Sequence, residues 1–176
     1  MTSREKKAII VITGAESTGK SALAIDLGRV FSSPWVPEYA REYLEKSGMT
    51  YTRSDVEAIA KVQIRQMEEA QNLVSRYVFF DTWLIITKVW LEIVYGAAPG
   101  WISDAIASAP VDLFLLCDTD IPWVPDPLRE NGGEMREVLS GLYRKNIESF
   151  GFRYKNITGF GEDRFAMARK IIQQFC

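Results

Sequence analysis

The chain has 176 residues, of which 47% are hydrophobic and 25% are charged, and this composition is ordinary for a globular protein with a substantial core. Its formal net charge of −2 argues against a basic surface for nucleic acid or an anionic membrane, and no apolar run reaches the length of a membrane span. Two cysteines and no histidine argue against a disulfide framework and a structural zinc site. We therefore expect one cytoplasmic domain, residues 1–176.

The most informative stretch is Gly14–Ser21, whose sequence GAESTGKS matches the phosphate-binding pattern GxxxxGK[ST] at every fixed position. An apolar run at 8–12 precedes it, as expected of a strand buried in a parallel sheet, and residues 22–31 have helical spacing. In such a loop, backbone N–H groups surround phosphate oxygens, the lysine reaches the outer phosphates and the serine hydroxyl ligates Mg²⁺. We therefore expect ATP and Mg²⁺ as cofactors, in a nucleotide site formed by Gly14, Glu16, Ser17, Thr18, Gly19, Lys20, Ser21 and Ala22.

The rest of the chain alternates predicted strands and helices. Apolar runs predict strands at 35–38, 77–81, 111–118 and 152–157, and helical spacing predicts helices at 39–46, 54–75, 87–95, 134–149 and 162–175. Because strands that alternate with helices pair in parallel, we predict a P-loop three-layer α/β sandwich with a mostly parallel five-stranded sheet.

Acidic residues close three of the predicted strands. Asp81 and Asp118 each follow an apolar run, and an acid at such a strand end can organise Mg²⁺ beside a phosphate loop, although spacing alone does not choose between them. Glu38 closes the short strand at 35–38, at the edge where ligands of open α/β sheets collect. Without histidine, the proton of an attacking hydroxyl would go to a carboxylate, and Asp81 or Glu38 is the candidate. Asp81 as a turn cap and Glu38 as a solvated charge are the structural alternatives.

Residues 119–136 contain a proline-rich stretch and a Gly-Gly pair, which suit neither a sheet nor a helix interior. Loops of this length in a compact domain are usually functional, so we expect a lid. From this lid, Arg129 and Arg136 would close over the transferring phosphoryl group. Arg129 next to Glu130 also fits a surface ion pair of little energetic value.

Four stretches resemble a known family when taken together and in order. They are the GxESTGKS form of the loop, VPEYAREY at 36–43, FDT at 80–82 with Thr87, and PWV at 122–124 with Asp126, Leu128 and Arg129. This pattern, which extends over residues 9–172, resembles the ribosylnicotinamide kinase domain of NadR-type proteins. The resemblance implies phosphoryl transfer from ATP to the ribose 5′-hydroxyl of nicotinamide riboside, giving nicotinamide mononucleotide in NAD biosynthesis. It also implies that Asp81, not Asp118, lies near Mg²⁺.

The substrate site is where this chain departs from the family. Many relatives have Asp-Thr-Asp where this chain has Asp81-Thr82-Trp83, and this change leaves the identity of the acceptor open. Two alternatives therefore stand beside the riboside kinase: a kinase for another nucleoside or small molecule, and a nucleotide-binding regulatory ATPase. The nicotinamide ring of the riboside is a pyridinium cation, which binds well against aromatic faces. Trp90 has the helical spacing of a core residue. We expect the substrate site to include Glu38, Tyr39, Arg41, Trp83 and Trp123.

Overall fold

The computed structural model describes residues 7–125 and 131–175. Within these residues, five strands form one parallel sheet in the order β2-β3-β1-β4-β5. The strands are β1 (Ala8–Gly14), β2 (Trp35–Val36), β3 (Tyr77–Asp81), β4 (Leu113–Cys117) and β5 (Tyr154–Ile157). The parallel pairing confirms the predicted P-loop α/β sandwich.

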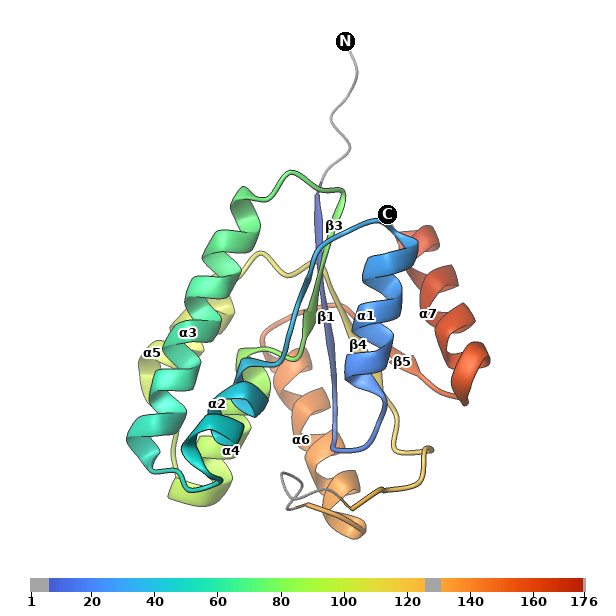
Figure 1. Ribbon diagram of the computed structural model, residues 1–176. Coiled ribbons are helices and arrows are strands. Elements are labelled where there is room, and N and C mark those ends of the chain that lie inside the picture. Colours follow the sequence, from blue (N-terminus) through green and yellow to red (C-terminus); the bar gives the residue numbers. More distant parts are fainter. Residues whose placement is uncertain (1–6, 126–130, 176) are drawn as a thin grey trace.

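Helices cover both faces of this sheet (Figure 1). One face packs against α1 (Lys20–Val30) and α7 (Gly161–Phe175), and the other packs against α3 (Arg53–Asn72), α4 (Leu84–Tyr95), α5 (Gly100–Ser108) and α6 (Glu134–Ser149). The short helix α2 (Tyr39–Ser47) lies against α3. None of the helices in the described part of the chain has the length and apolar character needed to cross a membrane.

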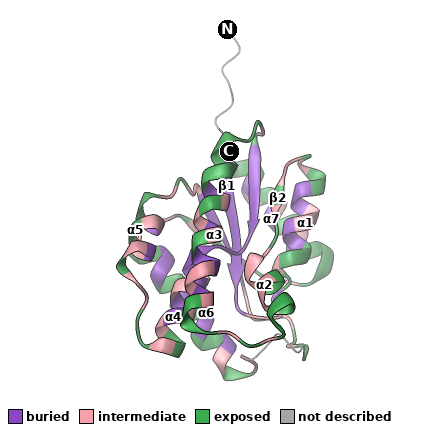
Figure 2. Cartoon of the chain, turned by 60° about the vertical axis from the view of Figure 1, so that its left-hand side comes forward, coloured by how far each residue is buried: buried purple, intermediate pink, exposed green. Residues whose placement is uncertain are grey.

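Burial on both faces explains why the first strand reads as an unbroken apolar run. All seven residues of β1 are buried, and its side chains alternate between the two core clusters: Ile9 and Val11 pack toward α3–α6, and Ile10 and Ile12 toward α1 and α7. Figure 2 shows the buried strands at the centre and the exposed surfaces of the helices around them. The carboxyl ends of β1 and β3 lie side by side, since Ile12 pairs with Asp81.

Several element boundaries differ from the sequence-based expectation, and the described residues contain one helix that the sequence pattern does not predict. Helix α3 begins at Arg53, one residue before the expected start. Thr52 and Asp55 form its capping box: the Thr52 side chain accepts from the Asp55 N–H, and the Asp55 carboxylate accepts from the Thr52 N–H at 2.7 Å. Helix α4 begins at Leu84, three residues before the expected start. Helix α5 lies outside the predicted helices; it begins at Gly100, just after Pro99.

Candidate active site

The phosphate loop leaves the carboxyl end of β1 and turns directly into α1. Gly14 has φ +144°, and a Cβ at this position would lie 2.6 Å from the carbonyl oxygen of Cys117 on the neighbouring strand β4. Gly19 has φ +76° immediately before the first helical residue, Lys20. Both glycines are therefore required by backbone geometry, since other residues would be strained or would clash.

A cavity of about 400 Å³ opens over this loop. It has the size of a small-molecule site. The Lys20 ammonium lies within the loop and donates to the Ala15 carbonyl at 2.7 Å, and the buried Thr18 hydroxyl donates to the same carbonyl at 2.8 Å. Every residue expected to bind nucleotide lines the cavity: Gly14, Glu16, Ser17, Thr18, Gly19, Lys20, Ser21 and Ala22.

Asp81 lies beside the loop at the end of β3. Burial raises the pKa of its carboxyl, and hydrogen bonding from the Ser21 hydroxyl and the positive charge of Lys20 oppose that rise. Its Oδ1 atom is buried and has no hydrogen-bond partner among the described residues. A hydroxyl and a carboxylate with an unused oxygen fit Mg²⁺, which protein sites hold through one or two carboxylates together with phosphates and water. Asp118 instead accepts the N–H of Thr119 at 2.7 Å, within its own turn.

Glu38 and Arg41 also line the cavity, from the start of α2. Burial raises the pKa of the Glu38 carboxyl; the charges of Lys20 and Arg41 lower it, and the charge of Asp81 raises it. Glu38 precedes the first residue of α2, but its side chain makes no hydrogen bond that caps the start of this helix. A carboxylate with a raised pKa beside a phosphate loop is suited to accept a proton.

The remaining walls of the cavity are largely apolar. Tyr51, between α2 and α3, and Trp90 of α4 both line it, and their rings meet edge to face with centroids 4.7 Å apart. Gln63 is buried at the same cavity, and its side-chain oxygen accepts from the Thr87 hydroxyl at 2.6 Å. Further apolar residues complete these walls: Leu44, Met49, Ile86, Ile93, Val94 and Leu139.

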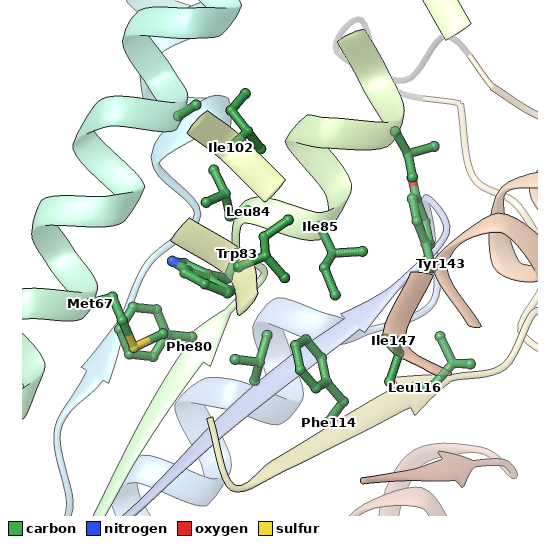
Figure 3. Close-up of a cluster of buried hydrophobic side chains, with 14 of the residues drawn as sticks. Met67, Phe80, Trp83, Leu84, Ile85, Ile102, Phe114, Leu116, Tyr143 and Ile147 are labelled. Atoms are coloured by element: carbon green, nitrogen blue, oxygen red, sulfur yellow. The ribbon is translucent and has the colours of Figure 1, made fainter. Parts of the chain in front are cut away.

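Trp83 does not lie in the cavity, and its expected substrate-binding role is corrected. It is 2% exposed and packs among Met67, Phe80 and Leu84 in the core (Figure 3). Its indole N–H donates to the backbone carbonyl of Gln63 at 3.0 Å. The turn at Thr82, where φ is +61°, sends the following residue under α3 and α4 instead of toward the phosphate loop.

Two other expected aromatic contacts also lie outside the cavity lining. Tyr39 pairs with Tyr43 on α2, with ring centroids 6.2 Å apart. Trp123 packs on Gly132, where an added Cβ would lie 3.0 Å from the indole ring. The aromatic residues that line the cavity are Tyr51, Trp90 and Tyr143, and substrate contact by Tyr39 and Trp123 stays a prediction. The sequence held one usable signal, the spacing that places Trp90 one turn after Thr87 and Ile86 on α4.

The two arginines expected on the lid have different outcomes. Arg129 lies outside the described residues. Arg136, in the first turn of α6, is 7% exposed, and its guanidinium donates to the carbonyls of Glu16, Ser17 and Ile121. It therefore binds the backbone of the phosphate loop, which differs from the expected position over a transferring phosphoryl group.

The sequence matches a described family and several known proteins. A family model described as an AAA domain (AAA_28) matches residues 9–164. The chain is similar to the trifunctional NAD biosynthesis/regulator protein NadR of Salmonella typhimurium, with 28% identity over 171 residues, and to that of Escherichia coli, with 27% identity over 173 residues. Each alignment covers 94% of this chain and 42% of the relative, so the chain spans less than half the length of these curated relatives.

Solved structures show the same fold. A crystal structure of NadR protein in complex with NR has a TM-score of 0.79 and 21% identity, covering 98% of this chain and 50% of that chain. Deoxyadenosine kinase from M. mycoides has a TM-score of 0.67 and 13% identity, covering 94% of this chain and 99% of that chain. These comparisons confirm the resemblance to NadR-type proteins and the P-loop kinase fold.

Proposed function

The chain belongs to this AAA-domain family, and on that premise we propose that it is an ATP-dependent kinase acting on the ribose 5′-hydroxyl of nicotinamide riboside. The observation that carries the proposal is one cavity lined both by the phosphate loop and by the Tyr51–Trp90 pair. The similarity to NadR over 94% of the chain supports the choice of acceptor.

In this proposal the loop amides and Lys20 bind the β- and γ-phosphates of ATP. Ser21 and Asp81 would hold Mg²⁺, which when bound neutralises charge on those phosphates. Phosphoryl transfer needs positioning and charge stabilisation more than covalent chemistry, and a preformed loop at a helix N-terminus supplies both.

Glu38 is the stronger candidate for accepting the proton of the attacking hydroxyl. Asp81 interacts with Ser21, whereas Glu38 lies at the cavity without a role in capping its helix. Its raised pKa brings its basicity closer to that needed near neutral pH. Glu38 would take the proton from the 5′-hydroxyl as that oxygen attacks the γ-phosphorus, and the bond from the γ-phosphorus to the bridging oxygen would break to release ADP.

The acceptor ring would lie against Tyr51 or Trp90. A pyridinium cation over such a ring gains roughly 0.5–2 kcal/mol, depending on how far the contact is desolvated. Leu44, Met49 and Ile86 would exclude water from this contact.

A different nucleoside is the second candidate, and one observation favours it. The carboxylates among the described lining residues are Glu16 in the phosphate loop and Glu38, whose pKa responds to Lys20. The Tyr51–Trp90 pair itself carries no negative charge, so it would also accommodate a neutral nucleobase.

The deciding experiment measures ADP release with Mg²⁺ and ATP, with and without nicotinamide riboside. Release that depends on the riboside and yields nicotinamide mononucleotide is expected, and Lys20→Ala should nearly abolish it. Turnover with uridine or adenosine but not with the riboside would select the second candidate. Slow ATP hydrolysis unaffected by any nucleoside would indicate a regulatory ATPase and contradict both.

A further inference from the structure

We propose that Arg136 is a positioning residue that fixes the phosphate loop in its phosphate-binding conformation before nucleotide arrives. This inference rests on the proposed nucleotide-binding role of the loop, but not on the identity of the acceptor. Its basis is one buried guanidinium that joins three backbone carbonyls from two separate segments.

The contacts are specific to the first half of the loop. Arg136 Nε donates to the Glu16 carbonyl at 3.1 Å, and Nη2 donates to the Ser17 carbonyl at 3.3 Å. A third bond, from Nη2 to the Ile121 carbonyl at 2.7 Å, ties the same group to the segment that follows β4. Arg136 is only 7% exposed, so these backbone carbonyls take the place of water as partners of its guanidinium.

These contacts also determine the direction in which backbone N–H groups of the loop point. The described residues contain no cis peptide bond, and in a trans peptide the carbonyl of one residue points opposite to the N–H of the next. The carbonyls of Glu16 and Ser17 point at Arg136, so the N–H groups of Ser17 and Thr18 point away from it. Ser17 and Thr18 both line the cavity, and amides aimed into such a loop bind phosphate oxygens.

The loop needs this support because its backbone is strained. Ser17 has φ +54°, a left-handed conformation that costs free energy in a residue with a side chain. Two further contacts brace the same residues: the Glu16 carboxylate accepts from the backbone N–H and the side-chain amide of Asn131, at 3.1 and 3.2 Å. The Ser17 hydroxyl and the Val124 backbone N–H lie 3.2 Å apart.

The kinetic signature of this role differs from that of a residue on the transferring group. Loop amides bind the phosphates in both the ground state and the transition state, so their loss raises KM for ATP and leaves kcat at saturating ATP nearly unchanged. An arginine that touched only the transferring phosphoryl would instead lower kcat.

The test is Arg136→Lys, with Arg144→Lys as control, because Arg144 is an exposed arginine on the same helix. Lysine keeps the charge but cannot span three carbonyls. We expect Arg136→Lys to raise both KM for ATP and the calorimetric Kd for Mg-ATP without acceptor by about ten-fold or more, with kcat within about two-fold of the parent. The control should match the parent in all three quantities.

Several outcomes would overturn the inference. Parent-like ATP affinity in Arg136→Lys would show that the charge alone suffices, and a large fall in kcat with unchanged KM would place Arg136 on the transferring phosphoryl. If Arg136→Lys is too unstable to assay, Arg136→Gln carries the test, since its side-chain amide can donate to fewer carbonyls than the guanidinium and leaves no unpaired charge at a buried position. It should also raise the Kd for ATP, and an unchanged Kd would contradict the proposal. If the parent itself fails to bind ATP, the proposed function fails instead.

Discussion

Tyr51 and Trp90 meet at 76° with ring centroids 4.7 Å apart, and both face the cavity that the phosphate loop lines. Tyr51 comes from the connection between α2 and α3, and Trp90 from the middle of α4, so the fold brings together two aromatic rings that are 39 positions apart in the sequence. This pair is the part of the site most suited to discriminating among acceptors.

Trp90→Ala should erode the preference for nicotinamide riboside over uridine by about ten-fold in kcat/KM, because a desolvated cation–aromatic contact is lost. Trp90→Phe should retain most of the preference, since it keeps an aromatic face. Competition between the two nucleosides, run on the parent and both variants, measures the effect. Trp123→Ala serves as the control, and erosion of the preference by that variant instead would refute the assignment of the ring site.

Asp81→Asn should lower kcat by about 100-fold, while ATP binding stays detectable by calorimetry, because the lost charge acts on Mg²⁺ during transfer and not on the loop amides. Asp118→Asn is the matched control after β4, on the other side of β1, where the carboxylate accepts from the Thr119 N–H. The opposite result, a silent Asp81→Asn and a damaging Asp118→Asn, would place the metal near Asp118 and show that its assignment to Asp81 is wrong.

The rate should fall as pH is lowered through the pKa of Glu38, because a base acts only when deprotonated. Burial raises this pKa above 4.5, so the fall should begin at a higher pH than for an ordinary glutamate. Glu38→Gln should reduce kcat by about 100-fold or more and remove this acidic limb, as read from kcat/KM against pH. The exposed Glu68→Gln should keep the parent profile.

The same raised pKa has a consequence for stability that gives an independent check. Above its folded pKa the charged Glu38 is disfavoured in the native state, and below its unfolded pKa both states are protonated and the penalty vanishes. Glu38→Gln should therefore raise Tm at pH 7, and its advantage should disappear at low pH. A lowered Tm at pH 7 would show that the charge is stabilising where it lies.

Trp83→Ala should destabilise the protein by about 3–5 kcal/mol, because it empties a site that is 2% exposed in the core. Trp83→Phe should cost less, since it loses mainly the hydrogen bond to the Gln63 carbonyl. Urea denaturation measures both effects. Trp83→Phe should prefer the same nucleoside as the parent. A changed preference would show that Trp83 contributes to the substrate site.

The fold could be predicted from local patterns because its main features are local. The loop motif fixes where β1 ends and α1 begins, and a sheet covered on both faces makes β1 and β3 continuous apolar runs. Spacing alone did not predict which residue caps α3, because Thr52 and Ser54 both offer hydroxyls and the backbone path selects Thr52. Helix α5 was not predicted, since the proline and glycine that start it resemble a loop signal.

The phosphate end of the site was predictable and the aromatic end was not. Gly14 and every residue from Glu16 to Ala22 line the cavity, so one motif locates them all. Trp83 and Trp90 are both large aromatics near a phosphate loop, and only the turn at Thr82 decides that Trp83 enters the core. The role of Arg136 depends on carbonyl directions within the loop, which side-chain spacing does not encode.

The close approach of Gly14 to the Cys117 carbonyl places a cysteine beside the phosphate loop, where chemical labelling of its thiol can measure local opening of the fold. Cys117 is buried under the phosphate loop, and burial raises the pKa of its thiol to about 11, so the folded state offers no reactive thiolate at neutral pH. In a Cys176→Ser background this is the only sulfhydryl, and its alkylation would require opening of the core cluster that Cys117 shares with α1 and α7. The rate of thiol labelling would therefore measure how often this region opens. Any ligand that binds only the closed form should lower that rate.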